Sequence, residues 1–172
     1  MDADRRLRWG FSLFCDDFRP EIGGKVSLMG IYQSDYIFQG PLPHLAPKFG
    51  ILIMYYEFYD APEQKLEFRV FLPSDDPEKP TITFPLDREN APRPEKLPLV
   101  GNETEEDSER IFHARIPIIF SPLLLPKAGR IKVRAAFGDG TILRLGSLMA
   151  RPATDDESKV LFGVPAPPPP SA

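Results

Sequence analysis

The sequence contains a single cysteine, Cys15, and only two histidines, His44 and His113. One cysteine cannot form an intrachain disulfide, so nothing in the sequence favours an oxidising compartment. A structural zinc site needs about four ligands at recognisable spacing, and these three scattered residues do not supply them. We therefore expect no metal site and no cofactor.

Long apolar runs are also missing. The longest run, Phe49 to Tyr56, has the length of a strand and is far shorter than the roughly 18 residues that a membrane-spanning helix requires. The first residues, M-D-A-D-R-R-L-R-W, lack the apolar stretch of a signal peptide. These features predict a cytoplasmic protein that has no membrane partner.

The chain is instead rich in proline and phenylalanine. It has 172 residues, 42% of them hydrophobic, with 21 prolines and 13 phenylalanines. This composition, with few amphipathic patterns of helix length, favours an all-β fold. We predict a single β-sandwich domain over 1–164, with a long acidic and proline-rich loop at 87–109 and a flexible proline-rich tail at 165–172. The formal net charge is -4, and the acidity is concentrated in the run Glu103 to Glu109.

The clearest local signal is a hairpin around Gly138-Asp139-Gly140. Alternating runs flank these three residues, and a three-residue loop needs a left-handed residue that Gly140 can supply. The predicted register places Phe137 opposite Thr141, Ala135 opposite Leu143, Val133 opposite Leu145, and Arg134 opposite Arg144.

Like charges that face each other across two strands are destabilising by a few tenths of a kcal/mol to about 1 kcal/mol. In the predicted hairpin, Lys132, Arg134 and Arg144 all lie on one face. We therefore expect either a carboxylate on a neighbouring strand or an anionic partner to relieve the repulsion.

Further alternating runs predict the remaining strands. The run at 49–59 is apolar on both faces and should be a central strand, whereas Pro117 places the run at 111–120 at a sheet edge or a bulge. Residues 15–24 are predicted to be a turn-rich connection, and 154–164 carries no predicted element. About eight strands fit a two-sheet antiparallel β-sandwich, with a partly open β-barrel as the alternative. The predicted strands are 7–14, 25–32, 36–38, 49–59, 64–72, 81–86, 111–120 and the hairpin.

Four segments carry a resemblance to a known family. The N-terminal segments F-C-D-D at 14–17 and G-K-V-S-L-M-G-I-Y at 24–32 resemble the signature of a family of small bacterial proteins, catalogued as a domain of unknown function. The segments F-S-P at 120–122 and G-R-I-K-V-R at 129–134 are similar to its C-terminal half. The resemblance spans roughly residues 7 to 150 and implies a bacterial β-sandwich with no established activity.

Cys15, Asp16 and Asp17 form the most site-like cluster in the sequence. A hydrolase could use the thiol as a nucleophile with His113 or His44, or could use the two aspartates. No local motif supports this chemistry, and the glycine pairs of the chain do not precede a helix as a phosphate loop requires. We favour a buried thiol that closes a strand, next to aspartates that cap a turn.

The basic residues are the best candidate binding site. Lys132, Arg134 and Arg144 form a stripe that Arg115 could join. The isoelectric point of about 5.3 argues against nucleic acid as the partner. We predict a non-catalytic protein-binding or assembly module, not an enzyme. The alternative is a sandwich that binds a small ligand or a carbohydrate through Trp9 or the tyrosines at 32, 36, 55, 56 and 59; a hydrolase is the third hypothesis.

Overall fold

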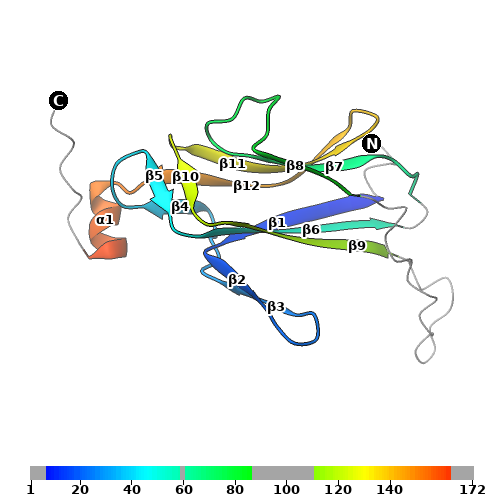
Figure 1. The fold of residues 1–172 in the computed structure, drawn as a ribbon. Helices are drawn as coiled ribbons and strands as arrows, with labels where there is room; N and C mark the ends of the chain where they lie inside the picture. The colour runs from blue at the N-terminus through cyan, green and yellow to red at the C-terminus, as the bar shows by residue number, and fades with distance from the viewer. Residues whose placement is uncertain (1–6, 59–60, 87–110, 164–172) are drawn as a thin grey trace.

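The computed structural model describes residues 7–58, 61–86 and 111–163. Tyr59, the predicted loop at 87–109 and the predicted tail at 165–172 lie outside these residues. Within them the chain forms two main sheets that stack as two layers (Figure 1). The predicted all-β sandwich is confirmed, and the strands do not close into a barrel.

Three long antiparallel strands form one sheet in the order β1-β6-β9. They are β1 (Arg8–Cys15), β6 (Phe49–Phe58) and β9 (Ile111–Phe120). As predicted, β6 is central and the strand that contains Pro117 lies at an edge. An edge position suits Pro117 because proline has no N–H group for a second ladder.

Five strands form the other sheet in the order β4-β12-β11-β7-β8. Their bounds are β4 (Asp35–Phe38), β7 (Leu66–Phe71), β8 (Ile82–Leu86), β11 (Gly129–Phe137) and β12 (Ile142–Pro152). The β4 strand runs parallel to β12, whereas the other pairs are antiparallel. The prediction of a wholly antiparallel sandwich is therefore wrong at this edge of the sheet.

Two short strand pairs and one helix complete the described structure. The pair β2 (Asp17–Pro20) and β3 (Val26–Met29) forms a hairpin that projects from the three-stranded layer (Figure 1). The pair β5 (His44–Ala46) and β10 (Leu123–Leu125) continues the β6–β9 ladder beyond a bend. The helix α1 (Asp155–Phe162) follows β12.

The number of strands is thus larger than predicted, with twelve in the described residues instead of about eight. Residues 15–24 were predicted to be a connection, but 17–20 form β2. Residues 154–164 were given no element, but they contain α1.

Helix α1 begins with a reciprocal pair of hydrogen bonds. Thr154 accepts a hydrogen bond from the Glu157 amide, and the Glu157 carboxylate accepts one from the Thr154 amide. This is a capping box, and its T-D-D-E sequence is the signal that could have predicted the helix.

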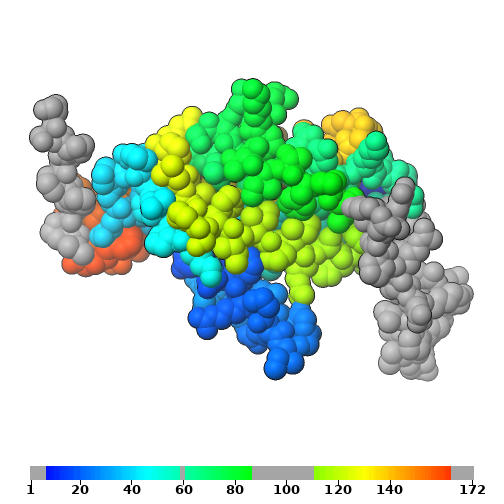
Figure 2. All heavy atoms as spheres, viewed as in Figure 1, coloured from blue at the N-terminus to red at the C-terminus, as the bar shows by residue number. Residues whose placement is uncertain are grey.

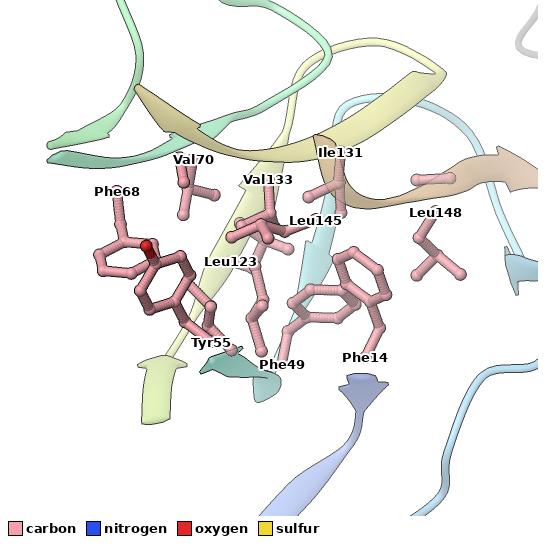
Figure 3. Close-up of a cluster of buried hydrophobic side chains, with 14 of the residues drawn as sticks. Phe14, Phe49, Tyr55, Phe68, Val70, Leu123, Ile131, Val133, Leu145 and Leu148 are labelled. Carbon is pink, nitrogen blue, oxygen red and sulfur yellow. The ribbon is translucent and has the colours of Figure 1, made fainter. Parts of the chain in front are cut away.

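The hydrophobic core lies between the two sheets. Phe14, Phe49 and Tyr55 rise from the three-stranded sheet and meet Val133 and Leu148 from the five-stranded sheet (Figure 3). A pair of rings also joins the layers, because Tyr55 packs edge-to-face on Phe68 with centroids 5.5 Å apart. The residues predicted to face inward do so in four strands, β7, β8, β9 and β11.

The β11–β12 hairpin follows the predicted register only near its turn. Ala135 pairs with Leu143 and Arg134 with Arg144, as predicted. A β-bulge then shifts the register, so that Val133 faces Gly146 and not Leu145. The bulge changes the phase of β12 and lets both Leu145 and Leu148 point into the core, which strict alternation forbids.

Candidate binding surfaces on the two sheets

The outer face of the three-stranded sheet carries a row of stacked rings. Trp9 on β1, Tyr56 on β6 and His113 on β9 occupy one register row across the sheet. The Trp9 and Tyr56 ring centroids are 5.5 Å apart with planes at 8°, and those of Tyr56 and His113 are 4.9 Å apart at 14°. We call these three residues the aromatic row.

Apolar side chains extend this surface on both sides of the aromatic row. Phe58 packs against Trp9 with ring centroids 5.2 Å apart. Several large side chains remain exposed to solvent, among them Trp9 at 37%, Phe11 at 43% and Ile119 at 45%. Arg115 lies two register rows from the rings, on the same face, and donates a hydrogen bond of 2.5 Å to the Gly24 carbonyl, in the β2–β3 hairpin. We call the outward residues of β1, β6 and β9 the aromatic face.

Close packing of the sheets explains why the aromatic residues of β1 point outward. A Cβ atom on Gly10 would lie 2.5 Å from the Met54 carbonyl oxygen and 2.8 Å from Leu145 Cδ2. Only a residue without a side chain fits there. Because successive residues of a strand face opposite sides, the small residues at 10 and 12 face inward and Trp9 and Phe11 face outward.

The predicted basic stripe lies on the outer face of the five-stranded sheet. Arg134 on β11 pairs with Arg144 on β12 and with Arg69 on β7, so three arginines form one register row across three strands. We call Arg69, Arg134 and Arg144 the arginine row. Arg130 and Lys132, which are both exposed, project from β11 on the same face.

The central arginine of the row has no carboxylate partner among the described residues. Arg134 Nη1 donates to the Val133 carbonyl at 2.9 Å and to the Gly146 carbonyl at 3.5 Å. Desolvation and, secondly, the charge of Arg144 lower the pKa of Arg134. The predicted carboxylate does exist on a neighbouring strand, but Glu67 bonds Arg69, at 3.0 Å, and not Arg134.

The structure therefore brings together three of the four predicted basic residues. Lys132, Arg134 and Arg144 share one face, whereas Arg115 lies on the other sheet and does not join them. The sequence analysis missed Arg69, because its place in the row depends on β7 pairing with β11. Nothing local to either strand signals that pairing, which joins segments about 60 residues apart.

The Cys15 cluster is a buried part of the fold. Cys15 is fully buried, and burial, followed by the charges of Asp16 and Asp17, raises the pKa of its thiol. Cys15 pairs with Gly50 on β6, whereas His113 pairs with Tyr56, six residues further along that strand. Six residues of a strand span about 20 Å, so these two side chains cannot form a catalytic pair.

The two aspartates that follow Cys15 form polar contacts with other segments of the chain. Asp16 accepts a hydrogen bond from the Tyr32 hydroxyl, and Asp17 pairs with Lys48 at 2.5 Å. Asp17 also accepts a hydrogen bond from the Phe18 amide, but it lies in strand β2 and not in the predicted turn. Nearby, the His44 ring hydrogen-bonds the Tyr36 hydroxyl at 2.8 Å, and burial lowers the pKa of His44. No group of residues in the described parts of the chain has the composition of a metal site.

Most of the tyrosines considered for ligand binding are unsuited to it. Tyr55 is fully buried, and Tyr32 and Tyr36 are half-buried against Phe49. Of the described residues of that hypothesis, Trp9 and Tyr56 lie on an outer face.

Comparison of the sequence with protein-family models and with curated proteins gives no match. The resemblance to the bacterial family thus stays a prediction. Of the described residues, no helix has the length and apolar character needed to cross a membrane.

Proposed function

We propose that this protein is a binding or assembly module that docks another protein on its aromatic face. The observation that supports this proposal is the inverted pattern of β1. This strand turns Trp9 and Phe11 to solvent and Gly10 to the core. The close packing at Gly10 determines which side of β1 faces outward, but it does not require large aromatic residues on that side. Polar residues there would serve a strand that only completed the sandwich.

The chemistry of the aromatic face matches that of protein interfaces. Tryptophan, tyrosine and arginine are the residues most enriched among those that dominate binding energy, and Trp9, Tyr56 and Arg115 combine all three. The exposed apolar side chains of β1 and β9 lie on either side of the half-buried Met54, Tyr56 and Phe58 of β6 on this face. The β2–β3 hairpin projects from the three-stranded layer (Figure 2), and Arg115 is hydrogen-bonded to its tip at Gly24.

A carbohydrate is the second candidate ligand, because Trp9 and Tyr56 share an exposed face. Sugars bind aromatic residues on free ring faces. Tyr56 lies between Trp9 and His113, so both of its ring faces are already in contact with other rings. The row therefore favours a protein partner over a sugar.

Hydrolysis by Cys15 has less support than either form of binding. A thiol attacks as the thiolate, and a thiol that is buried and has a raised pKa is mostly protonated at neutral pH. Asp16 and Asp17 are engaged by Tyr32 and Lys48 respectively.

The test is affinity purification of the full-length protein from its own host with two matched variants. Phe11→Ser/Ile119→Ser removes two apolar side chains from the aromatic face. Leu45→Ser/Leu124→Ser removes a pair with similar exposure from β5 and β10. We expect a stoichiometric partner with the wild type and with the Leu45/Leu124 variant, but not with the Phe11/Ile119 variant. A partner recovered equally with all three proteins would show that the aromatic face is not the docking site.

A further inference from the structure

We propose that the arginine row, together with Arg130 and Lys132, is a second docking surface, which binds an acidic segment of a protein partner. This surface lies on the sheet opposite the aromatic face and does not depend on it. The proposal can therefore be tested independently of the function proposed above.

The first argument is the number of positive charges that the fold leaves without a counterion. Adjacent strands are about 4.8 Å apart, so the three arginines start from backbone positions within about 10 Å. The acidic residues that share this face are already paired, Glu67 with Arg69 and Asp35 with Arg151. Within the described residues, Arg134 and Arg144 have no carboxylate partner, and Arg130 and Lys132 form no ion pair.

The second argument is that this arrangement is unfavourable for folding alone. Like charges directly opposite each other weaken a sheet, and Arg134 faces an arginine on both sides. Arg134 is also half-buried, and its hydrogen bonds go to main-chain carbonyls. A bound anion would convert the same repulsion into a set of favourable pairs.

Carboxylates are the anions that fit this surface best. A guanidinium binds a carboxylate through two parallel hydrogen bonds, and a row of guanidiniums can receive several carboxylates at once. The surface is the open face of a sheet rather than a concave pocket, which favours a macromolecule over a small ligand. An extended acidic segment presents carboxylates of alternate residues about 7 Å apart, within reach of flexible arginine side chains.

Nucleic acid fits this surface less well. Proteins that bind single strands interleave basic residues with exposed aromatic residues, but Phe71, which pairs with Lys132, is half-buried. The sequence-based expectation of no nucleic-acid partner agrees with this preference.

The experiment measures binding of a fluorescent octaglutamate peptide to the full-length protein by anisotropy at low salt. We expect Arg134→Gln/Arg144→Gln to weaken binding by about tenfold or more, since it removes two of the charges that contact the peptide. The control Arg19→Gln/Lys25→Gln removes the same charge from the exposed β2–β3 hairpin and should change binding by less than about twofold. An eight-residue oligothymidylate is measured in parallel.

Equal affinity of the wild type and the Arg134/Arg144 variant would overturn the proposal. So would an equal loss in the hairpin control, because that result would indicate only net charge. Tighter binding of oligothymidylate through Arg134 and Arg144 would assign the surface to nucleic acid. The double variant should keep or raise the melting temperature, because it removes a repulsion; should it fail to fold, the exposed Arg144→Gln alone carries the same comparison.

Discussion

The thiol of Cys15 shows how burial at one residue removes a possible chemistry. Its side chain is fully buried and its pKa is raised. We predict that a chromogenic disulfide reagent modifies the native protein roughly a hundredfold more slowly than the protein in denaturant, because the thiol must first be exposed by opening of the structure. Rapid modification of the native protein would show that Cys15 is accessible and would revive the hydrolase hypothesis.

The ion pair between Arg8 and Glu57 is the most buried ion pair in the part of the chain that the structure describes. Arg8 Nε donates to Glu57 Oε1 at 2.9 Å, and the two side chains are only 6% and 3% exposed. The Tyr55 hydroxyl donates to Glu57 Oε2 at 3.1 Å, and the Arg8 guanidinium lies 5.0 Å from the centre of the Phe137 ring. Neutralising one member of a buried ion pair costs far more than neutralising one of an exposed pair, so we predict that Glu57→Gln lowers the free energy of unfolding by about 3–5 kcal/mol.

The control for this prediction is Glu67→Gln, measured by the same chemical denaturation. Glu67 also pairs with an arginine on its own strand, at 3.0 Å, but those two side chains are 44% and 38% exposed. Exposed pairs contribute about 0–1 kcal/mol because solvent screens them. A similar loss in both variants would mean that burial does not govern the strength of the Arg8–Glu57 pair.

At the scale of elements, Arg151 holds helix α1 to the five-stranded sheet. Arg151 forms two hydrogen bonds of 2.7 Å with Glu157 on α1, and one of 2.9 Å with Asp35 on β4. We predict that Glu157→Gln makes the amides of 155–162 exchange several-fold faster, measured by hydrogen–deuterium exchange, because it removes the charge that pairs with Arg151, although glutamine can still form the capping box. Asp156→Asn is the matched control, since Asp156 lies in the same helical turn but is almost fully exposed.

The ion pair between Arg151 and Glu157, which anchors α1, should also make the stability of this helix depend on pH. The hydrogen bonds from Arg151 lower the pKa of Glu157 from 4.5 to about 2. Because the folded-state pKa lies below the unfolded value, the anchor stabilises α1 fully above pH 4.5 and is lost only as the pH falls toward 2. Protection of 155–162 in wild-type protein should therefore persist at pH 4. Loss of that protection near pH 5 would contradict the lowered pKa.

The elements that could be predicted from sequence are those whose packing obeys simple alternation. In β7, β9 and β11 every second residue faces the core, so the pattern defines both the strand and its inner face. The bulge in β12 could not be predicted, because it depends on Gly146 passing close to Ser12 of the other sheet. Helix α1 had a sequence signal in its capping box, but its apolar residues are too few for a periodic pattern.

At the scale of the whole molecule, part of each proposed surface could be predicted. The cross-strand pair Arg134–Arg144 followed from the turn alone, because a hairpin fixes its own register. The place of Arg69 in the arginine row, and the aromatic row itself, could not be predicted, because both depend on which strands from distant parts of the chain pair with each other. The sequence also does not indicate which face of β1 points to the core. The alternation of β1 predicts a strand, but it does not predict that Gly10, rather than Trp9, faces the other sheet.

The close approach of the two sheets at Gly10 gives the last prediction. Because a Cβ atom there would lie within 3 Å of both Met54 and Leu145, any side chain must force β1 away from β6 or from β12. We predict that Gly10→Ala lowers the free energy of unfolding by about 1–3 kcal/mol, the usual cost of overpacking a core. The measurement is equilibrium denaturation in urea.

Gly138→Ala is the matched control for this substitution. Its nearest contact would be 3.5 Å, to Lys65 Cβ, and its backbone is not in the left-handed region. We expect the control to change stability by no more than about 0.5 kcal/mol. If Gly10→Ala were equally harmless, the sheets could separate at little cost. The outward direction of Trp9 and Phe11 would then no longer follow from packing, and selection for binding would have to account for it alone.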